Sequence, residues 1–139
     1  MPTVTLTQLI DRPVAVVFAV VTDIEKYPEW DPPVRSVTWD GQMGFGVTYD
    51  MTVDSFGVMT FEVTEFEVDR VVRAVPRHKR FSGGHRLTFS EDGQMTRIDH
   101  EFVIEPKGAL RLLSPVFGIM ARRGLKGSTE GLKDYCERQ

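Results

Sequence analysis

The dipeptide Asp92-Gly93 separates two runs of alternating apolar and polar residues, 80–90 and 95–105. An Asp-Gly pair in this setting is the strongest short-range signal for a β-hairpin with a two-residue loop. Because the loop sets which residues face each other, this dipeptide predicts the register of the two strands. No other feature constrains the fold as directly.

In the predicted register, apolar residues face apolar residues and positive charges face negative ones. A slip of one residue would turn one strand's apolar side chains toward water, so this agreement supports the register. Opposite charges directly across an antiparallel pair add to it. The predicted pairs are Glu91 with Gln94, Phe89 with Thr96, Leu87 with Ile98, Phe81 with Ile104, Arg86 with Asp99 and Arg80 with Glu105.

The same register places His85 opposite His100 on the apolar face. Opposed residues have Cβ atoms about 4.5 to 5.5 Å apart, so the two rings can share a proton, a water or a polar group of a ligand. Burial would lower the pKa of each ring, which suits a general acid/base. The alternative, which we favour for an isolated pair, is two wall histidines bonded to each other, to Tyr49 or to water. A bulge at Gly83-Gly84 would not disturb this pairing.

Size and charge limit the class of protein. The chain of 139 residues has a net charge of −3, so we expect one domain over residues 1–139 and no nucleic-acid partner. Cys136 is the single cysteine, so no intrachain disulfide can form. We expect a cytoplasmic monomer or homodimer without signal peptide, integral membrane segment or cofactor. Two histidines are too few for a metal site.

The first thirty residues predict a strand followed by two short helices. Residues 3–10 alternate threonine with apolar residues, which indicates a half-buried strand. Residues 13–21 are rich in valine, but the Asp and Pro at their start favour a helix. Thr22 and Glu25 have capping-box spacing, so a second short helix is expected to begin here and to end before Pro28.

From residue 34 to residue 105 the pattern has period two and predicts about six strands in a meander. The strands near 47–53 and 59–64 give the sheet a broad apolar face. Turns are expected at Asp40-Gly41, 54–57, Val68-Asp69, 76–78 and Asp92-Gly93.

Residues 109–137 have helical periodicity and predict one long helix, with a kink near Pro115. Its glycines each cost up to about 1 kcal/mol relative to alanine, so their lack of a side chain must serve a purpose. Close packing of helix and sheet is the interpretation we favour, and room for a ligand is the alternative. The apolar stripe comprises Phe117, Ala121, Leu125, Ser128, Leu132 and Tyr135, and the glycines are Gly118, Gly124, Gly127 and Gly131.

Several short motifs occur in a characteristic order along nearly the whole chain. The motifs are Asp11-Arg12-Pro13, Val17-Phe18, Asp23, Tyr27-Pro28, Trp30, Met43-Gly44-Phe45-Gly46, the Asp92-Gly93 hairpin, Pro106-Lys107-Gly108 and Leu132-Lys133. Together they resemble the polyketide cyclase/dehydrase and lipid-transport (SRPBCC) branch of the START-like superfamily. We interpret Asp23 as a helix start and Trp30 as a structural anchor.

The resemblance implies an α+β helix-grip fold of order β-α-α-β6-α. In this fold a curved antiparallel sheet of about seven strands wraps around a long C-terminal helix, with an apolar cavity between them. Members of the family bind or process polyketides, sterols, lipids, hormones and quinones, and the fold alone does not say which. The chain departs from aromatase-cyclases in lacking a clear cavity-facing arginine, for which Arg73 is the nearest candidate.

We therefore expect a carrier or sensor that binds a hydrophobic molecule such as a polyketide, lipid, sterol or quinone. The alternatives are a polyketide cyclase/dehydrase-type enzyme with His85 and His100 as acid/base groups and Tyr49 as a further catalytic candidate, and a protein-interaction module. The basic residues at 122, 123 and 126 fit a solvated helix face, with membrane docking as a lesser alternative. The expected ligand contacts are Tyr49, Met51, Met59, Phe61, His85, Leu87, Phe89, His100, Phe102, Phe117 and Met120.

Overall fold

The computed structural model describes residues 3–54, 56–78 and 80–138. Its strands are β1 (Thr3–Ile10), β2 (Val34–Thr38), β3 (Thr48–Val53), β4 (Gly57–Glu67), β5 (Val71–Pro76), β6 (Phe81–Asp92) and β7 (Met95–Pro106). The helices are α1 (Val14–Thr22), η1 (Ile24–Lys26), α2 (Tyr27–Trp30), η2 (Gly108–Leu113) and α3 (Ser114–Glu137), where η marks a 3₁₀ helix.

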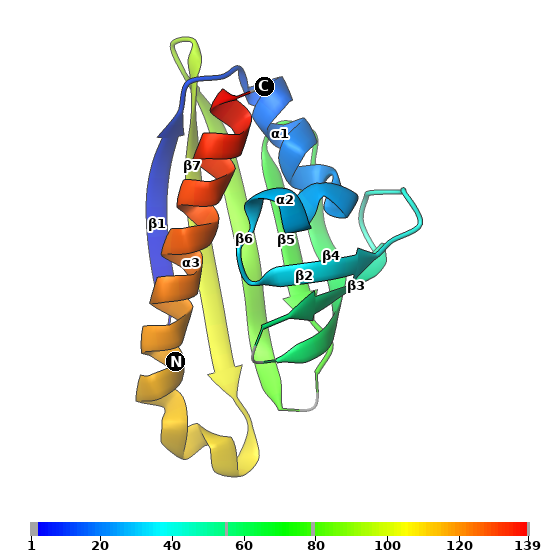
Figure 1. Ribbon diagram of the computed structural model, residues 1–139, viewed down its shortest axis with the longest axis vertical. Coiled ribbons are helices and arrows are strands. Elements are labelled where there is room, and N and C mark those ends of the chain that lie inside the picture. The colour runs from blue at the N-terminus through cyan, green and yellow to red at the C-terminus, as the bar shows by residue number, and fades with distance from the viewer. Residues whose placement is uncertain (1–2, 55, 79, 139) are drawn as a thin grey trace.

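The seven strands form one antiparallel sheet in the order β1-β7-β6-β5-β4-β3-β2. The sheet curves around α3, and α1 and α2 lie beside α3 over the same face of the sheet (Figure 1). This arrangement confirms the predicted helix-grip fold. The breaks between strands coincide with the expected turns. The turn expected at 54–57 includes residue 55, which lies outside the described ranges, and the turn at 76–78 adjoins residue 79, which also lies outside them.

The N-terminal elements form because each presents one apolar face. In β1 the side chains of Val4 and Ile10 are buried and the alternating threonines are exposed. In α1 the buried residues are Val17, Phe18 and Val21. Val17 and Val21 are about one helical turn apart and Phe18 follows Val17, so all three lie on one face of the helix. The helix predicted from the Asp-Pro start is therefore correct, despite the β-propensity of valine.

The expected short helix does begin after Asp23, as η1, but its capping box is absent and helical structure continues past Pro28 in α2. The Thr22 hydroxyl donates a 2.8 Å hydrogen bond to the Phe18 carbonyl within α1 instead of capping the next helix. The helix α2 contains Pro28 in its first turn, where a missing backbone N–H costs no hydrogen bond. Proline here starts a helix instead of stopping one.

The predicted register of the β6–β7 hairpin is wrong by two residues. Asp92 pairs with Met95, so the two loop residues are Gly93 and Gln94. Gly93 has a φ of 64° and Asp92 is not among the residues with positive φ. Glycine at the first loop position is the type II′ pattern, whereas a loop of Asp92 and Gly93 would need positive φ at both. Because side chains alternate with period two, the shift keeps every residue on its predicted face.

None of the directly opposed pairs predicted from the turn is present. Arg86 finds its carboxylate partner on β4 instead, with its Nε 3.1 Å from Glu65 Oε1. The ladder continues without a bulge past Gly83 and Gly84. The observed pairs include Leu87 with His100, His85 with Phe102, Arg86 with Glu101, Phe89 with Ile98, Ser82 with Glu105 and Phe81 with Pro106.

The long C-terminal helix begins five residues later than predicted. Residues Gly108–Leu113 form η2, and Pro115 lies in the first turn of α3 instead of kinking a longer helix. The predicted apolar stripe faces inward: Ala121, Leu125, Ser128 and Leu132 are buried, and Phe117 and Tyr135 are half-buried. This face of α3 closes the open side of the curved sheet.

Candidate functional site

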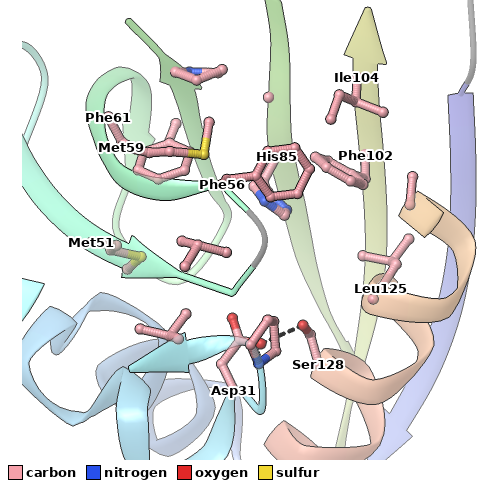
Figure 2. Close-up of a pocket in the computed structure, with 18 of the residues that line it drawn as sticks. Asp31, Met51, Phe56, Met59, Phe61, His85, Phe102, Ile104, Leu125 and Ser128 are labelled. Atoms are coloured by element: carbon pink, nitrogen blue, oxygen red, sulfur yellow. Dashed lines mark hydrogen bonds between the residues drawn. The ribbon is translucent and has the colours of Figure 1, made fainter. Parts of the chain in front are cut away.

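A cavity of about 290 Å³ lies between the sheet and α3. Its walls are mostly apolar side chains from β3, β4, β6, β7 and α3 (Figure 2). The volume is near the lower end of the range of small-molecule pockets, about 300 to 1,000 Å³. The sequence-predicted contacts that line it are Tyr49, Met51, Met59, Phe61, His85, Leu87, His100, Phe102, Phe117 and Met120.

Phe89, also predicted as a ligand contact, does not line the cavity. Its ring packs edge-on against Phe18 of α1, with ring centroids 5.1 Å apart. The same face of β6 lines the cavity at His85 and Leu87 and then passes under α1. Alternation identified the correct face of the strand but not the point where α1 covers it.

The two histidine rings meet on the sheet wall although their backbones are not opposed. Nδ1 of His85 lies 2.9 Å from Nε2 of His100, across a diagonal between β6 and β7. Diagonal neighbours are within reach of large side chains. The His85 ring also stacks on Phe102, its directly opposed residue, at a centroid distance of 4.3 Å and an angle of 11°. The predicted contact between His85 and His100 is therefore present although the predicted register is wrong, because the two side chains are long enough to meet across the diagonal.

Burial keeps both rings neutral. Burial lowers the pKa of His85 to about 4. Burial and, to a smaller extent, the nearby His85 lower the pKa of His100 well below its usual range. A 2.9 Å contact between neutral imidazoles requires one nitrogen to donate and the other to accept. The pair can thus present a donor or an acceptor toward a ligand, and can carry one proton between two rings.

A second polar group was not predicted from the sequence. Asp31 follows α2, and its Oδ1 accepts a 2.5 Å hydrogen bond from the Ser128 hydroxyl of α3 (Figure 2). Both residues line the cavity. Burial raises the pKa of Asp31 to about 6, and the Ser128 hydrogen bond opposes this shift. With a pKa of about 6, the Asp31 carboxyl group is mostly ionised at pH 7 and takes up a proton more readily than an exposed aspartate.

No cation compensates Asp31 within the described cavity lining, which contains no lysine or arginine. The other lining carboxylate, Asp54, is paired with Arg35 at 2.6 Å. Arg73, the nearest candidate for a cavity arginine, is exposed on the outer face of β5. The lining is therefore apolar with one uncompensated negative charge.

Three aromatic residues bring polar atoms to the same region. Burial raises the pKa of Tyr27 and of Tyr49, so both phenols remain protonated hydrogen-bond donors at neutral pH. The buried Nε1 of Trp30 has no hydrogen-bond partner among the described residues. Trp30 was expected to be a structural anchor only, yet it also lines the cavity.

The helix glycines serve both of the purposes considered from the sequence. A Cβ at Gly131 would lie 2.0 Å from the carbonyl oxygen of Trp30, so glycine is required there for close packing. A Cβ at Gly124 would meet nothing within 4 Å, and Gly124 lines the cavity. Packing explains the first position and open space explains the second.

Side chains that bind metal ions are dispersed in the described part of the chain. In residues 3–54, 56–78 and 80–138, no three His, Cys, Asp or Glu side chains gather closely enough to hold a metal ion. No helix within these ranges is both long and apolar enough to cross a membrane.

Solved structures share this fold across nearly the full chain. A START superfamily protein from Mycobacterium smegmatis is 17% identical, with a TM-score of 0.83 and coverage of 98% of this chain and 97% of that one. A protein from Thermus thermophilus is 16% identical, with a TM-score of 0.80 and coverage of 97% of each chain. The Zhui aromatase/cyclase from Streptomyces is 16% identical, with a TM-score of 0.75 and coverage of 98% of this chain and 93% of that one.

At these identities the structural likeness establishes the fold alone. A search of curated proteins gives no match. The profile of the family described as polyketide cyclase / dehydrase and lipid transport matches residues 1–137. The chain therefore belongs to the polyketide cyclase/dehydrase and lipid-transport family.

Proposed function

We propose that this protein binds a hydrophobic small molecule, as a carrier or sensor, in the cavity between the sheet and α3. The observation that supports this most is a largely apolar cavity with a few convergent polar groups, which is the usual composition of a ligand pocket. Methionines 51, 59 and 120 give part of the lining an adaptable shape. A polyketide, lipid, sterol or quinone would match this lining.

The polar groups narrow the chemistry of the ligand. Asp31 would repel a carboxylate or phosphate, since no lysine or arginine of the described lining offsets its charge. The histidine pair and the Tyr49 phenol can hydrogen-bond a carbonyl or hydroxyl. The preferred ligand is therefore uncharged, with one or two oxygen functions.

Binding can be tested with N-phenyl-1-naphthylamine, a neutral probe that becomes fluorescent in apolar surroundings. Gly124→Leu should weaken probe binding by about tenfold, because the added side chain enters the cavity. Lys126→Leu is the matched control, since it adds a leucine on the exposed face of the same helix. Equal affinity of the Gly124→Leu variant and the wild type would show that the probe binds elsewhere.

Competition tests the charge preference. We expect 1-dodecanol to displace the probe at lower concentration than dodecanoate, because Asp31 disfavours the carboxylate. Asp31→Asn keeps the shape and the hydrogen bond with Ser128 but removes the charge, so it should narrow this difference. Stronger displacement by dodecanoate in the wild type would contradict the assignment.

A second candidate function is catalysis of the polyketide cyclase/dehydrase type. It is favoured by the 2.9 Å contact of two neutral imidazoles on the cavity wall, which suits proton transfer at a carbonyl or enol. If these rings act as acid and base, replacing His85 and His100 together with glutamine should reduce turnover of a cyclisable polyketone by about 100-fold or more. Unchanged turnover would remove the histidine mechanism, whereas a modest change in affinity alone would support a binding role.

A further inference from the structure

Exposed apolar side chains are concentrated at one end of the molecule. Of the ten large apolar residues that are exposed in the described chain, five lie between residues 112 and 120. Leu112 is 87% exposed and Ile119 is 61% exposed, so most of the surface of each residue is open to solvent. The apolar tip, as we call this group, comprises Leu112, Leu113, Val116, Ile119 and Met120.

The apolar tip surrounds the start of α3, beside the cavity. It lies on η2 and the first two turns of α3, at the end of the molecule opposite α1 (Figure 1). Met120 belongs to the tip and also lines the cavity. Phe117, which is not part of the tip, lines the cavity as well. A surface that covers the tip would therefore lie next to the cavity wall.

The charged residues of the segment that carries the tip are all basic. Residues 107–129 contain five lysines and arginines and no aspartate or glutamate, in a chain with a net charge of −3. All five are exposed, and none forms an ion pair within the described part of the chain. They are Lys107, Arg111, Arg122, Arg123 and Lys126.

We propose that η2 and the first half of α3 dock on the surface of an anionic lipid membrane. Apolar side chains next to lysine and arginine are the composition of segments that lie in the membrane interface, where the bases meet anionic headgroups. A second copy of this chain is a poorer occupant, because a two-fold interface would bring the five bases against the same five bases.

The experiment is cosedimentation with vesicles of phosphatidylcholine alone or mixed with phosphatidylglycerol, at low and high salt. We expect binding to the anionic vesicles, weakened by salt and weak on phosphatidylcholine alone. Arg122→Gln with Arg123→Gln should lower the partition coefficient by roughly thirtyfold, on the basis of about fivefold for each base at an anionic surface. Leu112→Ser with Ile119→Ser should lower it on its own, because these side chains are exposed and their loss leaves the core intact.

Matched controls use the opposite end of the molecule. Arg70→Gln with Arg97→Gln makes the same change in net charge, and Val68→Ser removes an apolar side chain that is 67% exposed. Neither control should alter binding. Equal loss with the control arginines, or equal binding to both kinds of vesicle, would overturn the proposal.

Two further measurements separate this proposal from its alternatives. Analytical ultracentrifugation should show no self-association through the tip, and a dimer that Leu112→Ser with Ile119→Ser converts to a monomer would overturn membrane docking. The Gly124→Leu variant, with its cavity filled, should bind vesicles as the wild type does. Docking and ligand binding are thus tested independently.

Discussion

Substituting alanine at two glycines of α3 gives a direct test of the helix–core contact. Gly131→Ala places a methyl group where the carbonyl oxygen of Trp30 is only 2.0 Å away, while Gly124→Ala places one in open space. Both variants gain about 0.8 to 1.0 kcal/mol of helix propensity. The difference between them therefore isolates the cost of the contact at Gly131.

The size of that cost follows from what the methyl group would meet. Overpacking usually costs about 1 to 3 kcal/mol, and the obstacle here is backbone, which cannot rotate away as a side chain can. Taking about 3 kcal/mol, Gly131→Ala should lose about 2 kcal/mol of stability and Gly124→Ala should gain about 1 kcal/mol. For a chain of 139 residues, the two Tm values should differ by about 10 °C.

Urea unfolding followed by circular dichroism measures both free energies. The variants should share one m value, since neither changes the surface exposed on unfolding. If Gly131→Ala were as stable as Gly124→Ala, the close approach of α3 to the Trp30 carbonyl would not exist in solution. The packing of α3 against α2 would then need a different description.

Three further predictions concern buried groups. Acidification from pH 7 to 4.5 should destabilise the fold, because the lowered pKa values of His85 and His100 oppose protonation in the folded state, whereas the raised pKa of Asp31 favours it. Asp31→Asn removes the stabilisation that protonation of Asp31 gives at low pH. Between pH 7 and 4.5, the free energy of unfolding of this variant, measured in urea, should therefore fall by roughly 1 to 2 kcal/mol more than that of the wild type. Cys136 is fully buried, and burial raises its pKa to about 11, so a thiol reagent should label it slowly in the folded protein and rapidly once urea unfolds it. Phe89→Ala should cost about 3 to 5 kcal/mol and leave probe affinity unchanged, because Phe89 lies outside the cavity; weaker probe binding would contradict this.

Patterns with a period identified the elements and their faces well. Alternation and helical spacing depend only on local chemistry, so they predicted the meander, the apolar wall and the inward stripe of α3. The hairpin register was harder, because a two-residue loop can have Gly93 at its first or its second position. Local sequence does not distinguish these positions when Asp92 and Gln94 are both acceptable turn residues.

Proline and aspartate show where local rules are insufficient. Pro28 and Pro115 both lie in the first turn of a helix. The rule that proline interrupts a helix cannot distinguish a proline that begins a helix from one that follows its end. Asp31 was missed because its partner is Ser128, 97 residues away. The available signal was Ser128 itself, a polar residue inside an otherwise apolar stripe, since a buried hydroxyl requires a partner.

The distribution of charge connects the cavity with the proposed docking face. The unpaired carboxylate of Asp31 lies inside, and the five bases lie outside around the apolar tip. If both proposals hold, anionic lipids attract the basic outer face of the protein, but the negative charge of Asp31 excludes them from the cavity. The same charge favours an uncharged ligand inside it. The cargo would then be a neutral molecule dissolved in the membrane, and not the lipid that holds the protein there. Vesicles that carry a neutral quinone small enough for the cavity should therefore lose quinone to the protein while keeping their phosphatidylglycerol. Extraction of both, or of phosphatidylglycerol alone, would refute this division of roles.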